Sequence, residues 1–136
     1  MDPARLKSIR LFEPFSDEQL QSIATFADET SVPAGENLVK EGDYSYDFIG
    51  IEDGTAEVLR GEDRVGELGP GDFFGEIGVM ERTLRTATVN ATSAMRLITL
   101  TRWDLMRMEK EMPDAMAQIR KAADERRPAS TDASAD

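Results

Sequence analysis

The chain has 136 residues, 40% of them hydrophobic, and a formal net charge of −11 from 27 acidic and 16 basic side chains. This length and composition fit one domain with a modest core, and the acidic balance argues against nucleic-acid binding, which depends on Lys and Arg that neutralise phosphates. The absence of cysteine and histidine excludes disulfides, thiolate nucleophiles, zinc sites built on those ligands and every mechanism that uses an imidazole.

The N-terminal part predicts helices. Apolar Leu6 and Ile9, with charged residues between them, indicate a short helix within Asp2–Leu11. Ser16 opens a Ser-x-x-Gln capping box, and the apolar stripe behind it predicts a helix up to about Asp28. We expect this stripe to face the core.

From Thr30 onward the pattern is typical of strands. Short apolar runs alternate with glycine-containing turns every ten or so residues as far as Asp72. This spacing favours an all-β sandwich or barrel over a βαβ unit, and a jelly roll accommodates that many short antiparallel strands.

The stretch Phe74–Val89 carries the main functional signal. It opens with Gly75 and Glu76 at a predicted helix start, where unpaired N–H groups and the positive dipole end suit a phosphate. Arg85 would add a planar cationic fork that grips two phosphate oxygens, and Thr86 a hydroxyl donor beside it. Glu76 only accepts hydrogen bonds, so it suits a sugar hydroxyl.

The C-terminal third predicts one more long strand and two helices. Met95–Leu100 is apolar on both faces, which predicts a mostly buried strand. Thr101 is the expected N-cap of the next helix, in which Trp103 is expected to anchor the helix on the barrel; a ligand-stacking ring is the alternative. Pro113 suits the first turn of a last helix.

The last helix carries apolar residues at helical spacing, among them Met112, Met116, Ile119 and Ala122-Ala123. Beyond Pro128 the composition reduces to Ala, Ser, Thr and Asp, so we expect residues 128–136 to be a disordered tail.

The runs FGEIGV, MERT and LRTATV resemble the phosphate-binding cassette of the cyclic nucleotide-binding domain family. The family pattern is Phe-Gly-Glu-Leu-Ala-Leu, a short variable loop, then Pro-Arg-Ala-Ala-Thr-Val. The nine positions from Glu76 to Arg85 (85 minus 76) fit the usual loop length. Leu84 replaces the proline of many members, and Gly78 replaces alanine; neither removes a ligand-contacting group.

The resemblance implies a mainly β fold with flanking helices, covering residues 1–127. The fold expected is a jelly-roll β-barrel (double-stranded β-helix) with N-terminal helices, a short cassette helix and two C-terminal helices. The family's turn glycines would map onto Gly35, Gly42, Gly54, Gly71 and Gly75, each in a turn that a Cβ would strain.

The resemblance also implies roles for individual residues. Glu76 would hold the ribose 2′-hydroxyl, and Arg85 would pair with the cyclic phosphate with help from the Thr86 hydroxyl and the backbone amides of Gly75, Ile77 and Gly78. Met116 and Ile119 are candidates for base contacts, and packing of that stripe on the barrel or on a partner is an equal alternative. The full expected ligand-binding set is Phe74, Gly75, Glu76, Ile77, Gly78, Arg85, Thr86, Ala87, Met116 and Ile119.

The function expected is a cyclic nucleotide sensor, for cAMP first and for cGMP as the alternative, because members selecting cGMP often carry Thr where Thr86 stands. No catalytic residue, metal or cofactor is expected. An enzyme on the same scaffold is disfavoured, because cupin relatives with this architecture hold their metals with histidines and this chain has none. A ligandless protein-interaction module on the same jelly roll remains an alternative.

The expected partners are the cyclic nucleotide, an unknown downstream protein and a second copy through the C-terminal helix, if that helix is not a lid over the base. The chain ends where a transcription factor of this family would continue into a helix-turn-helix, so a stand-alone bacterial sensor without nucleic-acid binding of its own is expected. The apolar runs are too short to span a bilayer, and no signal-peptide core is visible, so a cytoplasmic location is expected.

Overall fold

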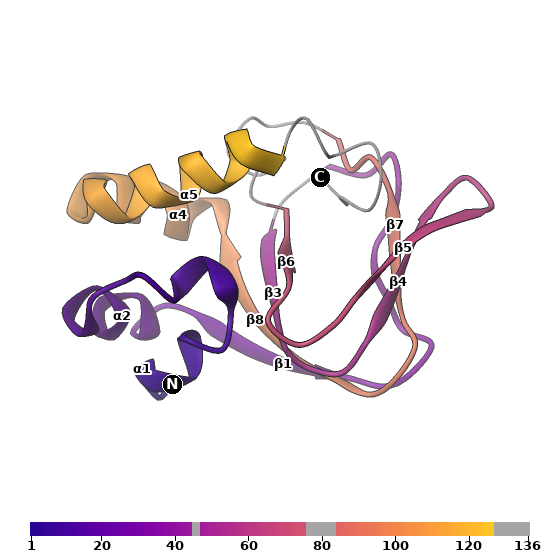
Figure 1. Cartoon of the computed structure of the whole chain (residues 1–136), viewed down its shortest axis with the longest axis horizontal. Coiled ribbons are helices and arrows are strands. Elements are labelled where there is room, and N and C mark those ends of the chain that lie inside the picture. Colours follow the sequence, from indigo (N-terminus) through magenta and orange to yellow (C-terminus); the bar gives the residue numbers. More distant parts are fainter. Residues whose placement is uncertain (45–46, 76–83, 127–136) are drawn as a thin grey trace.

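Two four-stranded antiparallel sheets form the centre of the fold, and the helices gather on the outer face of one of them (Figure 1). The computed structural model describes residues 1–44, 47–75 and 84–126. Strand order is β1–β8–β3–β6 in the first sheet and β2–β7–β4–β5 in the second. The strands are β1 Asp28–Val32, β2 Asn37–Val39, β3 Asp47–Asp53, β4 Ala56–Arg60, β5 Asp63–Leu68, β6 Phe73–Phe74, β7 Thr88–Ala91 and β8 Met95–Thr101.

The helices lie at both ends of the chain. The N-terminal ones are α1 Pro3–Leu6, the 3-10 helix η1 Arg10–Phe12 and α2 Asp17–Ala24, and the C-terminal ones are α4 Arg102–Glu111 and α5 Pro113–Arg126. The predicted mainly β, jelly-roll fold with flanking helices is therefore confirmed. Across the described part of the chain, no helix combines the length and apolar character that a membrane crossing needs.

Strand β8 separates two hydrophobic cores. Its side chains alternate between the two faces of the sheet, as the pleat requires. Met95 and Leu97 are buried between the two sheets. Ile98 and Leu100 are buried on the other face, against the helices. The predicted burial of both faces of this strand is confirmed.

The helical core joins the two ends of the chain. Phe12 from η1 and Ile23 from α2 pack in one buried cluster with Met108 from α4 and Ile119 from α5. The N-terminal and C-terminal helices therefore form one layer on the first sheet (Figure 1).

The helix starts follow local sequence signals. Ser16 accepts a hydrogen bond from the backbone N–H of Gln19, whose side chain accepts one from the Ser16 N–H, which is the predicted capping box. Thr101 caps α4 in the same reciprocal way with Asp104. Pro113 begins α5 as predicted.

The short helix predicted within Asp2–Leu11 is confirmed as α1, and the 3-10 helix η1 follows it. Two other local predictions were wrong. Helix α2 ends at Ala24, because Asp28 already pairs with Thr99 of β8 at the start of β1. Trp103 does not anchor α4, since 76% of its side chain is exposed; Leu105 and Met108 anchor the helix instead.

The five turn glycines expected from the resemblance all have φ between 89° and 95°. Gly54 shows why a side chain is excluded there. A Cβ at this position would lie 2.3 Å from the carbonyl oxygen of Ala94. The β3–β4 turn therefore packs directly against the backbone of the turn before β8.

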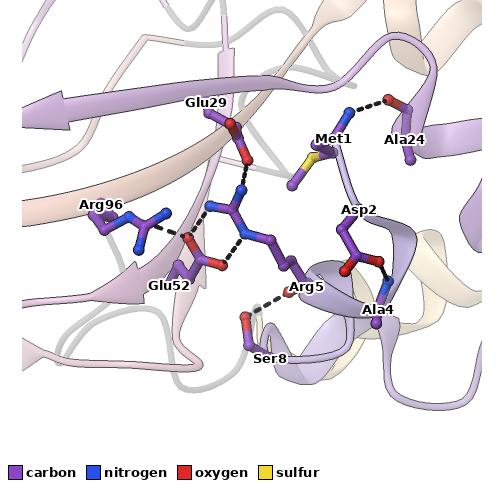
Figure 2. A network of polar contacts seen from close by, with 9 residues as sticks. All are labelled: Met1, Asp2, Ala4, Arg5, Ser8, Ala24, Glu29, Glu52 and Arg96. Carbon is purple, nitrogen blue, oxygen red and sulfur yellow. Dashed lines mark hydrogen bonds and ion pairs between the residues drawn. The ribbon is translucent and has the colours of Figure 1, made fainter.

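A charged network fastens α1 to the first sheet (Figure 2). The Arg5 guanidinium donates to both carboxylate oxygens of Glu52 on β3, at 2.7 Å and 2.5 Å. It also donates to Glu29 on β1. Arg96 on β8 contributes a second cation, 3.7 Å from Glu52. One guanidinium thus links a helix to two strands, and the hydrogen bond from Arg5 lowers the pKa of the Glu52 carboxyl.

Replacing Glu52 with Gln should reduce the acid sensitivity of folding. A carboxylate whose pKa is lower in the folded state stabilises the fold above its unfolded pKa and loses that contribution as pH falls through the folded pKa. We therefore expect the free energy of unfolding of wild type to fall more steeply than that of Glu52→Gln below the ordinary pKa of 4.5. Urea unfolding at about pH 7 and about pH 3 measures this. The exposed Glu62 supplies the control variant, Glu62→Gln; equal pH slopes for wild type and Glu52→Gln would contradict the prediction.

Candidate functional site

Arg85 is a buried cation at the edge of a pocket. Only 4% of the residue is exposed. Its Nη2 donates to the backbone carbonyl of Asp47 at 2.7 Å. The guanidinium carbon lies 6.0 Å from the centroid of the Phe74 ring, which is itself buried. Because a buried charge is costly without such polar surroundings, this arrangement holds the guanidinium in a defined place.

The backbone of Arg85 is held by the loop between β2 and β3. Its N–H donates to the carbonyl of Asp43 at 2.7 Å, and its carbonyl accepts from the N–H of Gly42 at 2.9 Å. Next to it, Leu84 forms an antiparallel bridge with Tyr44. The segment that carries Arg85 therefore pairs with a loop far away in the sequence, and both its backbone and its side chain are oriented.

Gly75 leaves the room that Arg85 occupies. A Cβ on Gly75 would lie 2.6 Å from Arg85 Nη1 and 2.7 Å from the carbonyl oxygen of Asp47. Its φ of 95° is also one that residues with a side chain rarely adopt. Phe74 comes just before it in β6 and pairs with Ile49 of β3. The start of the predicted cassette thus packs onto β3. The first residue of that strand, Asp47, accepts the hydrogen bond from Arg85.

A pocket of about 460 Å³ opens beside Arg85, within the size range of small-molecule sites. It has an apolar wall and several charged groups. The lining residues are Leu38, Val39, Lys40, Gly42, Asp43, Tyr44, Asp47, Ile49 and Arg85. An apolar wall beside a fixed guanidinium suits a ligand that combines an anionic group with a flat or apolar part.

Asp47 places a carboxyl in the same pocket. Burial raises the pKa of this carboxyl, the charge of Arg85 acts in the opposite direction, and Asp104 and Asp28 raise it further. The acceptor for Arg85 is the backbone carbonyl of Asp47, so the carboxyl is an additional negative charge beside the cation. It weakens the positive field that an anionic ligand would meet.

The structure brings together only part of the predicted site. Phe74, Gly75 and Arg85 are in contact, whereas Ala87 is buried between the sheets and Thr86 is exposed. Glu76, Ile77 and Gly78 lie outside the described residues, as does the predicted tail, residues 128–136. Their predicted roles stay predictions.

Met116 and Ile119 belong to the helical core, where they are 2% and 1% exposed. Neither lines the pocket beside Arg85. Their contact with a base stays a prediction, and this arrangement is the packing alternative named for them.

The sequence patterns did not point to Asp47 or to the loop residues Lys40 and Tyr44 as neighbours of Arg85. Gly42 is expected from the sequence only as a turn glycine, whereas in the structure Gly42 and Asp43 pair with the backbone of Arg85 and orient it. Among the described residues there is no group of three or more Asp or Glu side chains that could hold a metal ion.

Comparisons with known proteins agree on one family. The family model described as "Cyclic nucleotide-binding domain" matches residues 29–111. The chain is 35% identical over 95 residues to a cAMP-dependent protein kinase regulatory subunit of Schizosaccharomyces pombe, covering 69% of this chain and 23% of that protein. The chain thus spans about a quarter of the length of this curated relative.

Solved structures show the same fold. The N-terminal domain of a transcriptional regulator from Streptomyces coelicolor has a TM-score of 0.77 at 25% identity, covering 100% of this chain and 99% of that one. The catabolite activator protein of Thermus thermophilus has a TM-score of 0.78 at 23% identity, covering 89% of this chain and 59% of that one.

Gly75→Ala should destabilise the fold more than the same change at Gly35. Both glycines have φ near 90°, so each alanine meets backbone strain of about 1–3 kcal/mol. Nothing lies within 4 Å of a Cβ at Gly35, whereas at Gly75 the Cβ meets Arg85 and Asp47. Thermal and urea unfolding of the two variants measure the difference, which is the cost of displacing the guanidinium and the Asp47 carbonyl. Equal losses of stability would show that Gly75 is needed only for its φ.

Proposed function

Because the chain belongs to the cyclic nucleotide-binding domain family, we propose that it is a sensor that binds a cyclic nucleotide in the pocket beside Arg85. The observation that carries this proposal is the buried guanidinium, held at the edge of a pocket with an apolar wall. A cyclic phosphate has one negative charge and two exocyclic oxygens. A planar guanidinium can pair with both oxygens at once.

The cassette supplies the other polar contacts in this proposal. Glu76 accepts a hydrogen bond from the ribose 2′-hydroxyl, and the backbone N–H groups of Gly75, Ile77 and Gly78 donate to the phosphate. Such N–H groups at a helix start bind anions well. Thr86 adds a hydroxyl next to Arg85. All of these roles are carried from the family pattern onto matching residues.

We take cAMP as the first ligand to test and cGMP as the alternative. The Schizosaccharomyces pombe relative is named for cAMP. A relative from Eimeria tenella, 33% identical over 87 residues, is named a cGMP-dependent protein kinase. Thr86 is compatible with either base, because its hydroxyl suits a guanine amino group as well as a phosphate oxygen.

Signal output would pass through the helical layer. Asp47 receives the Arg85 hydrogen bond, and the next residue of β3, Phe48, packs in the helical core. A ligand that shifts Arg85 would therefore also shift Asp47, whose neighbour in β3, Phe48, packs against the helices. A base contact from Met116 or Ile119 requires α5 to leave that core, and the ligand must bind this second state better for the equilibrium to shift. The free helix would then be a lid or pair with a second copy.

Arg85→Ala should weaken cAMP binding by about 2–5 kcal/mol, or roughly 30- to 5,000-fold in Kd, because the phosphate loses its buried charge partner. Arg85→Lys should recover part of this, since an ammonium restores the charge without the two-pronged geometry. Isothermal titration with cAMP and with cGMP measures both Kd values. Arg64→Ala, at an exposed arginine on β5 outside the pocket, is the control.

An unchanged affinity in Arg85→Ala would refute the role of this residue. Absence of heat and of any thermal shift with either nucleotide in wild type would favour the ligandless interaction module on the same fold.

Asp47→Asn should strengthen binding of the anionic nucleotide by about 2- to 10-fold in Kd. The substitution removes a negative charge near Arg85 and keeps the backbone carbonyl that orients it. Because burial raises the pKa of Asp47, its ionised form disfavours folding at neutral pH, so the variant should also be no less stable there. Titration beside Asp63→Asn, an exposed control on β5, tests this. Weaker binding in Asp47→Asn would mean that the carboxylate itself contacts the ligand.

A further inference from the structure

One face of α4 exposes a stripe with the composition of a binding surface. Trp103 is 76% exposed and Met106 is 47% exposed. Arg107 and Lys110 are exposed too, and the spacing of these four residues places them along one side of the helix. We call these four residues the α4 stripe. Tryptophan, methionine and arginine are enriched in protein interfaces, and tryptophan and arginine dominate binding hot spots.

The stripe is rigidly presented. The opposite side of α4 is anchored in the helical core by Leu105 and Met108. The first turn is fixed by the reciprocal hydrogen bonds of Thr101 and Asp104. A partner therefore meets a formed helix, and binding costs little ordering of the backbone.

Arg107 is also held in place. Its guanidinium carbon lies 5.3 Å from the centroid of the Phe26 ring, and its Nε is 3.2 Å from Glu111 Oε2. The stripe therefore presents an ordered cation next to its two apolar side chains.

The α4 stripe carries only positive charge, although the chain is strongly acidic. Two acidic residues of α4 are engaged away from the stripe: Asp104 accepts from the Thr101 N–H, and Glu109 pairs with Arg120. Glu111 pairs with Arg107 of the stripe itself, so Lys110 is the stripe's main charge toward a partner. Lys110 forms no ion pair with any of the described residues. Its charge is available to a negatively charged partner.

Several other occupants fit less well. In a symmetric pair of stripes with parallel helices, Arg107 and Lys110 of one copy would face the same cations of the other, which is repulsive. With antiparallel helices Lys110 would face Trp103, and the stripe of the second copy would bring no carboxylate to either cation. Residues 128–136 contain only Pro, Ala, Ser, Thr and Asp, so they have no large apolar side chain to cover Trp103. A net charge of −11 opposes the approach of a nucleic acid or an anionic membrane, whose many charges repel the whole chain.

We propose that the α4 stripe is a docking surface for an amphipathic partner segment with apolar and acidic side chains. Its apolar side chains cover Trp103 and Met106, and its carboxylates pair with Arg107 and Lys110. This surface is separate from the pocket beside Arg85, since none of the four stripe residues lines that pocket.

Trp103 is the only tryptophan of the chain, so its fluorescence reports on the stripe alone. The probe is a synthetic amphipathic helix of about four turns, with leucines along one face and glutamates flanking that face, added to the full chain. We expect a saturable blue shift of the emission. Lys110→Glu should weaken binding by about 2- to 10-fold, because it replaces an attractive surface pair with a repulsive one. Trp103→Ala, followed by calorimetry, should weaken it at least about 30-fold.

The matched control is Lys121→Glu, the same charge change at an exposed position of α5; it should bind as wild type does. The proposal is overturned if the glutamate peptide gives no saturable shift, or if a peptide with lysines in place of glutamates binds equally well. It is also overturned if the emission shifts with protein concentration alone, which would indicate a second copy on the stripe. A shift on deletion of residues 128–136 would likewise overturn it, because it would indicate that this segment covers the stripe. A shift only with duplex DNA or phosphatidylserine vesicles would assign the stripe to those partners instead.

Discussion

A permanently charged guanidinium held almost out of water is the constraint that shapes the pocket. Burial of a charge is costly unless polar groups surround it. The Asp47 carbonyl supplies one acceptor, the missing side chain of Gly75 supplies room, and the loop backbone at Gly42 and Asp43 fixes the segment that carries Arg85. These groups come from separate parts of the sequence, so the site exists only when β3, β6 and the β2–β3 loop assemble around the cation. The Asp47 carbonyl is neutral, so the guanidinium keeps its positive charge toward the pocket, where a phosphate could pair with it.

The alternation of β3 links this site to the helices. Asp47 and Ile49 line the pocket, whereas Phe48 between them points into the helical core. There the centroid of its ring lies 5.8 Å from that of Phe12, in an edge-to-face arrangement, and 5.9 Å from that of Phe73. Because interiors are closely packed, a shift of the backbone at Asp47 must be accommodated by these rings. A movement at the pocket can therefore be transmitted to the helical layer through the backbone of β3, although the two lie on opposite faces of one sheet.

Signals that act over a few residues could be predicted from the sequence. The capping box at Ser16, the N-cap at Thr101 and the turn glycines are of this kind. Placement that depends on distant partners could not be predicted in the same way. Apolar residues lie on more than one side of α4, and only the packing of the helix decides that Leu105 faces the core and Trp103 faces solvent. The pairing of Arg85 with the β2–β3 loop depends likewise on the register between strands far apart in the sequence.

The burial of Arg85 also answers the difficulty that an acidic chain poses for an anionic ligand. Interactions between exposed charges are largely screened beyond about 8 Å at physiological ionic strength, whereas a buried charge acts at short range in a less polar medium. A ligand that has entered the pocket would therefore meet mainly the charges that line it, which are those of Arg85, Lys40, Asp43 and Asp47. The net charge of the rest of the chain would act on it only weakly. The same reasoning applies to α4, where the acidic side chains are engaged and the cations face outward beside Trp103. At both proposed sites the local arrangement of a few groups would decide which partner is attracted, and the total charge would oppose large polyanions.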